Sequence, residues 1–319
     1  MSGREAIGAD LGGTKLATGV IDEELNILHE SRESSTGRSE DEVVGTIEEE
    51  LREAIAARPE VIGAGLGIPC TIDRERGLAI NAVNLEITDV PIRDIMRERL
   101  GIPVFMDNDG NCAALAEHRF GAAKGAQNAL LLTIGTGIGG GIIINKQVYR
   151  GTTGAAAELG HVVVQENGPP CQGTCPNHGC VETMASGTAL AREGTAAAGR
   201  HPESLLNRSL QEGGGISGKV VTEAALAGDE VALEVVAEAG RQLGVALASL
   251  VNIFDPDVVV IGGGVAAGAG DLLVDPAREE MRRRALPPMN NTPVALAELG
   301  ADAGMIGAAQ MVRDELAET

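Results

Sequence analysis

The alternation of apolar and polar positions predicts two similar strand–turn–strand units. Residues 5–21 read as an apolar strand, a tight turn of glycine and threonine, and a second apolar strand. Residues 129–144 repeat this order around a Gly-Thr-Gly turn. Such turns let the backbone approach a ligand closely and present N–H groups and a hydroxyl, as phosphate-binding turns do. The repeat indicates two halves of one fold, each offering a turn to a shared phosphate chain.

The segments around these units alternate between helical periodicity and short apolar runs. Residues 39–58 predict an acidic amphipathic helix that Pro59 ends. Residues 81–85 carry two asparagines and predict a loop that faces a site. The other predicted elements are strands at 61–68 and 104–106, helices at 91–100, 186–250 and 302–316, and a strand, glycine turn and helix at 257–273. We expect the C-terminal helix to return to the first half.

Composition and charge narrow the class of protein. The 319 residues are 44% hydrophobic, enough for two domains or one large one. The formal net charge is −21 and only four of the 25 basic residues are lysine, which we interpret as adaptation to high salt. This charge argues against nucleic-acid binding, which requires a basic face. No apolar run resembles a signal peptide or a membrane span, so we expect a cytoplasmic protein.

Acidic residues at two strand ends are candidates for phosphoryl-transfer chemistry. Asp10 ends the first apolar run and is a candidate ligand of Mg²⁺, directly or through water. Residues 107–111 hold four acids or amides between a strand and a helical run. One of these aspartates, held near a sugar hydroxyl, would take its proton during phosphoryl transfer. The alternatives are a plain hairpin turn after Asp10 and simple capping of the next helix.

A cysteine-rich segment at residues 158–187 predicts a zinc site. Cys171, Cys175 and Cys180 follow His161 at spacings of 10, 14 and 19 residues. Three thiolates and one imidazole are a set that closes a structural, tetrahedral zinc site. His178 is a rival fourth ligand, and the alternative to a metal is a loop with ordinary buried cysteines.

Two glutamates adjoin this segment's candidate ligands. Glu158 lies three residues before His161, and Glu182 lies two residues after Cys180. A metal that gathers those ligands therefore brings both carboxylates into one neighbourhood, where they would accept hydrogen bonds from vicinal sugar hydroxyls. The alternative is that both are solvated surface charges.

Taken together, these motifs resemble the ROK family (repressors, open reading frames and kinases) of the actin-like ATPase and sugar kinase superfamily. The resemblance runs from Asp10 to about Ala309. It rests on the ordered series D-x-G-G-T-K, G-x-P, N-D-x-N, G-T-G-x-G-G-G, E-x-G-H, a cysteine cluster ending in G-C-x-E, and I-G-G-G. Each motif is ordinary alone, and their order makes the series specific.

The resemblance implies an α/β fold with two actin-like (ribonuclease H-like) domains around a central cleft and a zinc knuckle inserted in the second domain. In this chain the first domain is predicted to comprise residues 1–112 and 304–319, and the second residues 113–303. The family also implies a homodimer or homotetramer.

The resemblance further implies a role for each matching residue. The general base is Asp109. The implied sugar contacts are Asn84, Asn108, Asp109, Glu158, His161 and Glu182. ATP and Mg²⁺ are implied at Asp10, Gly12, Gly13, Thr14, Lys15, Gly135, Thr136 and Gly137, with the adenosine side at Gly262, Gly263 and Gly264. Structural Zn²⁺ is implied at His161, Cys171, Cys175 and Cys180. A packing turn explains the late triple glycine equally well.

This sequence departs from the family pattern at two places. The family usually has C-x-C-x4-C, whereas three residues separate Cys171 from Cys175 here, so the knuckle must bulge and His178 competes with Cys171 as a ligand. The family's G-x-P is usually followed by glycine, where this chain has Cys70. Neither departure touches the expected chemistry.

The leading hypothesis is ATP-dependent phosphorylation of a hexose at its 6-hydroxyl, with glucose as the expected sugar. Kinases for N-acetylmannosamine, fructose, allose or N-acetylglucosamine remain open, because loops such as 70–90 hold the discriminating residues. A polyphosphate user is expected to show a basic track, which this sequence lacks. A sugar-sensing regulator is less favoured, because such members carry a helix-turn-helix domain ahead of the first motif and nine residues precede Asp10 here.

Overall fold

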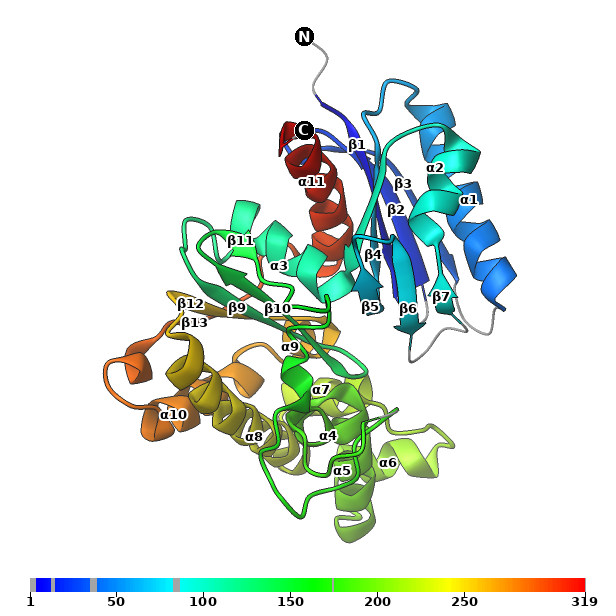
Figure 1. Cartoon of the computed structure of the whole chain (residues 1–319). Helices are drawn as coiled ribbons and strands as arrows, with labels where there is room; N and C mark the ends of the chain where they lie inside the picture. Colours follow the sequence, from blue (N-terminus) through cyan, green and yellow to red (C-terminus); the bar gives the residue numbers. More distant parts are fainter. Residues whose placement is uncertain (1–3, 13–14, 35–38, 83–86, 174, 319) are drawn as a thin grey trace.

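Two five-stranded sheets with the same strand order form the centre of the molecule (Figure 1). The structure is a computed structural model that describes residues 4–12, 15–34, 39–82, 87–173 and 175–318. The first sheet runs β3-β2-β1-β4-β8 and the second runs β11-β10-β9-β12-β13. In each sheet the first three strands pair antiparallel and the last two join in parallel. The two predicted strand–turn–strand units are therefore the centres of two sheets with one topology.

The first half of the chain builds the first sheet and the helices beside it. The strands of this sheet are β1 (Ala6–Leu11), β2 (Lys15–Ile21), β3 (Ile27–Ser34), β4 (Ala64–Ile68) and β8 (Val104–Asn108). Helix α1 (Glu40–Ala57) begins with a capping box between Ser39 and Glu42, and α2 (Ile92–Leu100) lies beside it (Figure 1). A smaller antiparallel sheet contains β5 (Cys70–Asp73), β6 (Leu78–Ala82) and β7 (Thr88–Val90).

The second half builds the second sheet and a cluster of helices on the side away from the first sheet (Figure 1). The strands are β9 (Ala129–Ile134), β10 (Ile138–Ile144), β11 (Gln147–Val148), β12 (Val258–Gly262) and β13 (Val294–Leu296). The helices are α4 (Val181–Ala185), α5 (Gly187–Arg200), α6 (Leu205–Gln211), α7 (Gly218–Leu226), α8 (Glu230–Phe254), α9 (Gly264–Ala269) and α10 (Asp271–Arg284). Short 3-10 turns occur at Leu159–His161, Met289–Asn291 and Gly300–Asp302. The helical prediction for residues 186–250 is confirmed.

Helices α3 (Asp109–Phe120) and α11 (Ala303–Glu318) pack together between the two sheets (Figure 1). Glycine makes this layer thin: a Cβ at Gly8 or Gly65 would collide with the backbone of α11, and one at Gly307 with the backbone of α3. Helix α11 therefore lies directly on β1 and β4, as expected of a C-terminal helix that returns to the first half. The predicted domain boundary after residue 112 falls inside α3, and the division into domains stays a prediction.

The structure corrects one local prediction. Asn81 was expected in a loop, but the backbone of residues 78–82 pairs with β5 on one side and β7 on the other, so Asn81 belongs to a strand. Ala82 belongs to the same strand, and the last three residues of that predicted loop, with Asn84, lie outside the described residues. Within the described part of the chain, no helix is long and apolar enough to cross a membrane.

Candidate active site and metal centre

The candidate general base, Asp109, is the first residue of α3 and directly follows β8. Asn108 caps this helix, because its side-chain oxygen accepts hydrogen bonds from the N–H groups of Gly110 (2.9 Å) and Asn111 (3.3 Å). Its amide nitrogen donates to the carbonyl of Cys70 at 3.3 Å. The carboxylate of Asp109 accepts from the N–H of Gly110 at 2.9 Å. The capping interpretation is thus confirmed for Asn108, and the cap fixes the position of the base.

Electrostatics raise the pKa of two carboxyl groups at this site. Burial is the largest cause and raises the pKa of Asp109 to about 6, although the hydrogen bond from Gly110 lowers it; the charge of Glu158 raises it further. Burial, and then the charge of Asp109, raises the pKa of Asp10 to about 7. A base with a pKa near the working pH is suited to accept a proton from an alcohol.

Both carboxylates line one cavity of about 190 Å³, which also touches the second sheet. Thr133, Gly262 and Gly263, which come from the second half of the chain, also line it. Gly263 has φ 87° and a Cβ there would collide with the backbone of β9, so this glycine serves close packing and leaves the cavity wall open. The cavity therefore joins acids from the first half to a glycine wall from the second.

The side chain of Asp10 fits a magnesium site. A Cβ at Gly304 would collide with the Asp10 carboxylate, so this acid lies against the first turn of α11. Two carboxyl groups with raised pKa values in one cavity offer hard oxygen ligands whose mutual repulsion a divalent cation would relieve.

The first glycine turn follows Asp10 and is described in part. The N–H of Gly12 donates to the carbonyl oxygen of Lys15 at 2.7 Å, and the Lys15 side chain is exposed. Gly13 and Thr14 lie outside the described residues.

The second glycine turn, Gly135–Gly137, joins β9 to β10, and residues of α4 and α5 hold it by hydrogen bonds. The N–H of Gly187, in the first turn of α5, donates to the carbonyl of Gly135 at 2.8 Å. The hydroxyl of Thr188 donates to the carbonyl of Thr136 at 2.9 Å. The carboxylate of Glu182 accepts from the N–H of Ile138 at 2.7 Å. Glu182, predicted as a sugar contact, is thus seen to support the Gly135–Gly137 turn.

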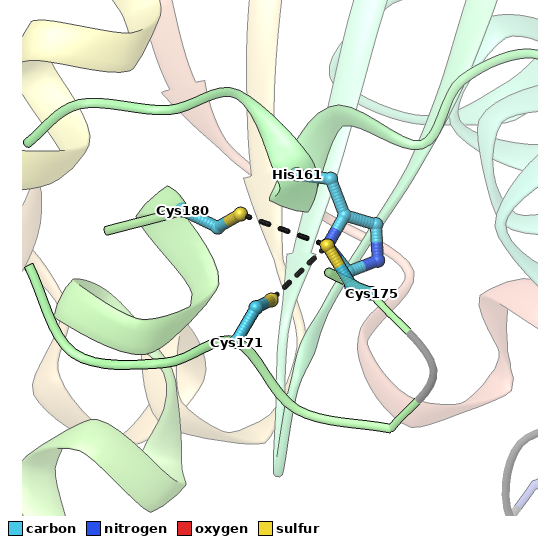
Figure 2. Close-up of side chains that lie close together, drawn as sticks. All are labelled: His161, Cys171, Cys175 and Cys180. Atoms are coloured by element: carbon cyan, nitrogen blue, oxygen red, sulfur yellow. Dashed lines mark hydrogen bonds between the residues drawn. The ribbon is translucent and has the colours of Figure 1, made fainter. Parts of the chain in front are cut away.

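His161, Cys171, Cys175 and Cys180 converge in one cluster (Figure 2). Their ligand atoms all lie within 4.8 Å of one another. The Nδ1 atom of His161 is 3.4 Å from the sulfur of Cys171, and the sulfurs of Cys175 and Cys180 are 4.0 Å apart. Zinc bonds of about 2.3 Å to sulfur and about 2.0 Å to nitrogen give tetrahedral edges of this size, so the four residues fit Zn²⁺.

The same geometry decides between the rival ligands. His178 lies outside the cluster, and its Nδ1 is 3.3 Å from the carbonyl oxygen of Gly168. Cys171 is therefore the fourth member, despite its displaced position in the sequence. With Nδ1 directed at the sulfurs, His161 keeps Nε2 for Glu158, whose carboxylate is 3.8 Å away and largely exposed. At that distance the two groups are in electrostatic contact but do not form a hydrogen bond.

Three residues of this region were missed by sequence reasoning. Asp107 is buried and forms an ion pair with Arg150 of the other half. Glu117 is buried in α3 and accepts N–H groups from Ala122 and Leu299, both at 2.9 Å. The sequence pattern at 107–111 identified Asp107 only as one of two aspartates and assigned it no partner. No local pattern identified Arg150, whose partner Asp107 is 43 positions away, or the contact between Glu117 and Leu299, which are 182 positions apart.

Two α/β halves of equal topology, with a cavity of acids and glycines between them, define the actin-like class of ATPase-related proteins. The chain belongs to the ROK family, whose model matches residues 6–315. It is 37% identical to the glucokinase of Halalkalibacterium halodurans over 99% of this chain and 97% of that protein.

Solved structures agree with this family. A ROK family glucokinase from Streptomyces griseus, in complex with glucose and AMPPNP, is 38% identical and covers 97% of this chain and 99% of its own, with a TM-score of 0.85. A ROK family transcriptional regulator, a homologue of the E. coli MLC protein, also has a TM-score of 0.85 at 27% identity, covering 98% of this chain and 78% of its own. The fold thus serves both kinases and regulators.

Proposed function

We propose that this protein transfers the γ-phosphoryl group of ATP to the 6-hydroxyl of a hexose, and that the hexose is glucose. The observation that carries the proposal is the Asp109 carboxylate, held at the start of α3 in the cavity between the sheets with a pKa of about 6. The glucokinase relatives support glucose as the sugar.

In the proposed reaction Asp109 accepts the proton of the 6-hydroxyl as that oxygen bonds to the γ-phosphorus. The bond from phosphorus to the β–γ bridging oxygen breaks, and ADP leaves. Bound Mg²⁺ would neutralise charge on the phosphate oxygens, and Asp10 is the residue that would hold it. The turns at Gly12 and Gly135–Gly137 would position the phosphates, and Gly262–Gly264 would lie on the adenosine side.

The sugar is proposed to lie between the base and the zinc cluster. Asn108 directly precedes Asp109, and Glu158 is close enough to raise the pKa of Asp109. His161, a member of the cluster, lies 3.8 Å from the Glu158 carboxylate. We propose a structural Zn²⁺ on His161 and the three cysteines, whose role is to fix this loop. Elemental analysis should find one zinc per chain in the purified protein.

We also propose that the two halves act as domains, 1–112 with 304–319 and 113–303, which close on the substrates. Closure would exclude water from the site. Water would otherwise compete with the sugar hydroxyl for the phosphoryl group. Homodimer or homotetramer formation and a cytoplasmic location stay predictions.

The decisive test is a coupled ADP-release assay across a panel of hexoses, with the Asp109→Asn variant alongside. We expect turnover with glucose and a loss of about 10²- to 10⁴-fold in kcat in the variant, since removal of a general base has this effect. Asp314→Asn, which changes a carboxylate on the far end of α11, is the matched control and should keep wild-type kcat.

Each other outcome has a defined meaning. Turnover with a different hexose would keep the reaction and change the substrate. No ADP from any hexose, in folded and zinc-loaded protein, would overturn the kinase proposal and turn attention to sugar binding without catalysis.

A further inference from the structure

We propose that Arg150 is a positioning residue for phosphoryl transfer: its ion pair with Asp107 ties the loop that carries Glu158 to the helix start that carries Asp109. The proposal rests on the kinase function proposed above. The two residues come from different halves of the molecule. Arg150 follows β11 of the second sheet, whereas Asp107 belongs to β8 of the first sheet.

Asp107 uses both carboxylate oxygens to organise the start of α3. One oxygen accepts from the backbone N–H of Asn108 at 2.8 Å and from the side-chain amide of Asn111 at 2.9 Å. The other accepts from Nε of Arg150 at 2.6 Å. The Asp107 side chain is 4% exposed and that of Arg150 is 26% exposed. The Asp107 carboxylate is therefore shielded from water, and it holds Asn108 and Asn111 on both sides of the base.

Arg150 is also the first residue of the loop that ends at Glu158. The N–H of Ala156 donates to the carbonyl of Arg150 at 3.2 Å, which closes the loop on itself. At its middle, Gly154 has φ 78°, and a Cβ there would collide with the carbonyl of Ile72 in β5. The loop of the second half is thus anchored to the first half at two points, Arg150 and Gly154. Its far end, Glu158, is close enough to Asp109 to raise the pKa of that carboxyl.

Charge balance explains why a cation is needed here. Asp10, Asp107, Asp109 and Glu158 all contribute negative charge around the start of α3. Removal of Arg150 would leave the carboxylate of Asp107 buried without its cation, and such a group moves toward water or repels its neighbours. The displaced parts would be the first turn of α3 and the 150–158 loop, which are the two segments that face each other at the base.

A small displacement at this place affects the rate of the chemical step. Reacting groups must be held close to their attack geometry, and a shift of about 1 Å can lower the rate about 100-fold. Arginine suits the task because its planar guanidinium keeps a fixed orientation toward a carboxylate. Lysine at 150 would keep the charge and lose that orientation.

The test is steady-state kinetics of the full chain, loaded with zinc and magnesium, with glucose and ATP varied separately. We expect Arg150→Ala to lower kcat by about 10-fold or more and to change each KM by less than about threefold. Arg150→Lys should recover part of kcat, and Asp107→Asn should lower kcat as well. The double variant should lose no more than the worse single variant, because both act through one pair.

The matched control is Arg119→Ala. Arg119 is also on α3 and pairs with Asp314 at 3.0 Å, but at the end of the helix away from the base. This variant should keep wild-type kinetics. Hydrogen exchange supplies a readout independent of activity: Arg150→Ala should increase exchange in peptides covering residues 108–112 and 150–158, and Arg119→Ala should not.

The proposal would be overturned if Arg150→Ala lowered the melting temperature but kept kcat within about twofold of wild type, because the pair would then only stabilise the fold. A change in KM alone would overturn it too. If Arg150→Ala does not fold, Arg150→Lys and Asp107→Asn decide the matter by the same criteria. A wild-type protein inactive toward every hexose would overturn the kinase function and this proposal together, whereas an active wild type with an equally active Arg150 series would overturn this proposal alone.

Discussion

The carboxyl groups of Asp10 and Asp109 show how one environment serves two roles. Both are raised in pKa by burial, to about 7 for Asp10 and about 6 for Asp109. A raised pKa makes Asp109 a better proton acceptor near neutral pH, and it makes Asp10 a site that gains from a bound cation. The fold bears a cost for both, because an ionised carboxylate is less stable here than in the unfolded chain.

This cost gives a residue-scale prediction for Asp10→Asn. The folded pKa of Asp10, about 7, lies above its ordinary value of 3.8, so the native state binds the proton more tightly than the unfolded chain does. Its contribution to stability is therefore present below about pH 4 and is lost as the pH rises to about 7. We expect Asp10→Asn to be more stable than wild type at pH 8 by about 2–4 kcal/mol, and equal to it near pH 4.

Urea unfolding in magnesium-free buffer at both pH values measures this difference. Asp314→Asn serves as the control, because this carboxylate lies outside the cavity. Added Mg²⁺ should stabilise the wild type and leave Asp10→Asn unchanged. A variant that is no more stable than wild type at pH 8 would show that Asp10 is not under electrostatic strain.

At the scale of elements, α4 connects the Cys3His cluster to the Gly135–Gly137 turn. Cys180 immediately precedes α4, and Glu182 lies in its first turn. The residue before this short helix, Cys180, is a member of the cluster. Glu182 in the helix accepts a hydrogen bond from the N–H of Ile138, next to the Gly135–Gly137 turn. Both contacts are at the start of α4, so a metal that fixes Cys180 would also fix the Gly135–Gly137 turn through Glu182.

Substitution of Glu182 separates its two proposed roles. Glu182→Ala removes the acceptor for the Ile138 N–H, and we expect the KM for ATP to rise about 5- to 30-fold, equivalent to about 1–2 kcal/mol. Glu182→Gln keeps an acceptor oxygen and should stay near wild type toward ATP. If the KM for glucose rises in the alanine variant while that for ATP stays constant, Glu182 contacts the sugar and the turn does not depend on it.

For the whole molecule, the net charge of −21 determines behaviour in salt. Like charges on a folded chain repel one another, and salt screens that repulsion. We expect the melting temperature and the turnover rate to rise as KCl increases from about 0.1 M, where the Debye length is about 10 Å, to about 1 M, where it is about 3 Å. Thermal unfolding and ADP release across this series provide the measurement. A melting temperature that stays flat or falls would argue against adaptation to high salt.

Much of the fold follows from local pattern. The strand–turn–strand units, the helix that Pro59 follows, the C-terminal helix and the Cys3His cluster were all predicted from spacing and turn residues, because each is set by neighbours in sequence. The position of Asp109 at the first turn of a helix after a strand was predicted in the same way.

What the sequence by itself determined is therefore the order of elements, the identity of the site motifs and the family. Only the tertiary structure decided that Asp107 pairs with Arg150, that Glu182 supports the Ile138 N–H, and that Cys171 and not His178 joins the cluster. The first two contacts join residues 43 and 44 positions apart, on different elements. No local pattern encodes such a contact, because it exists only after packing brings the two elements together, and the free energy that selects it is that of the whole packed core.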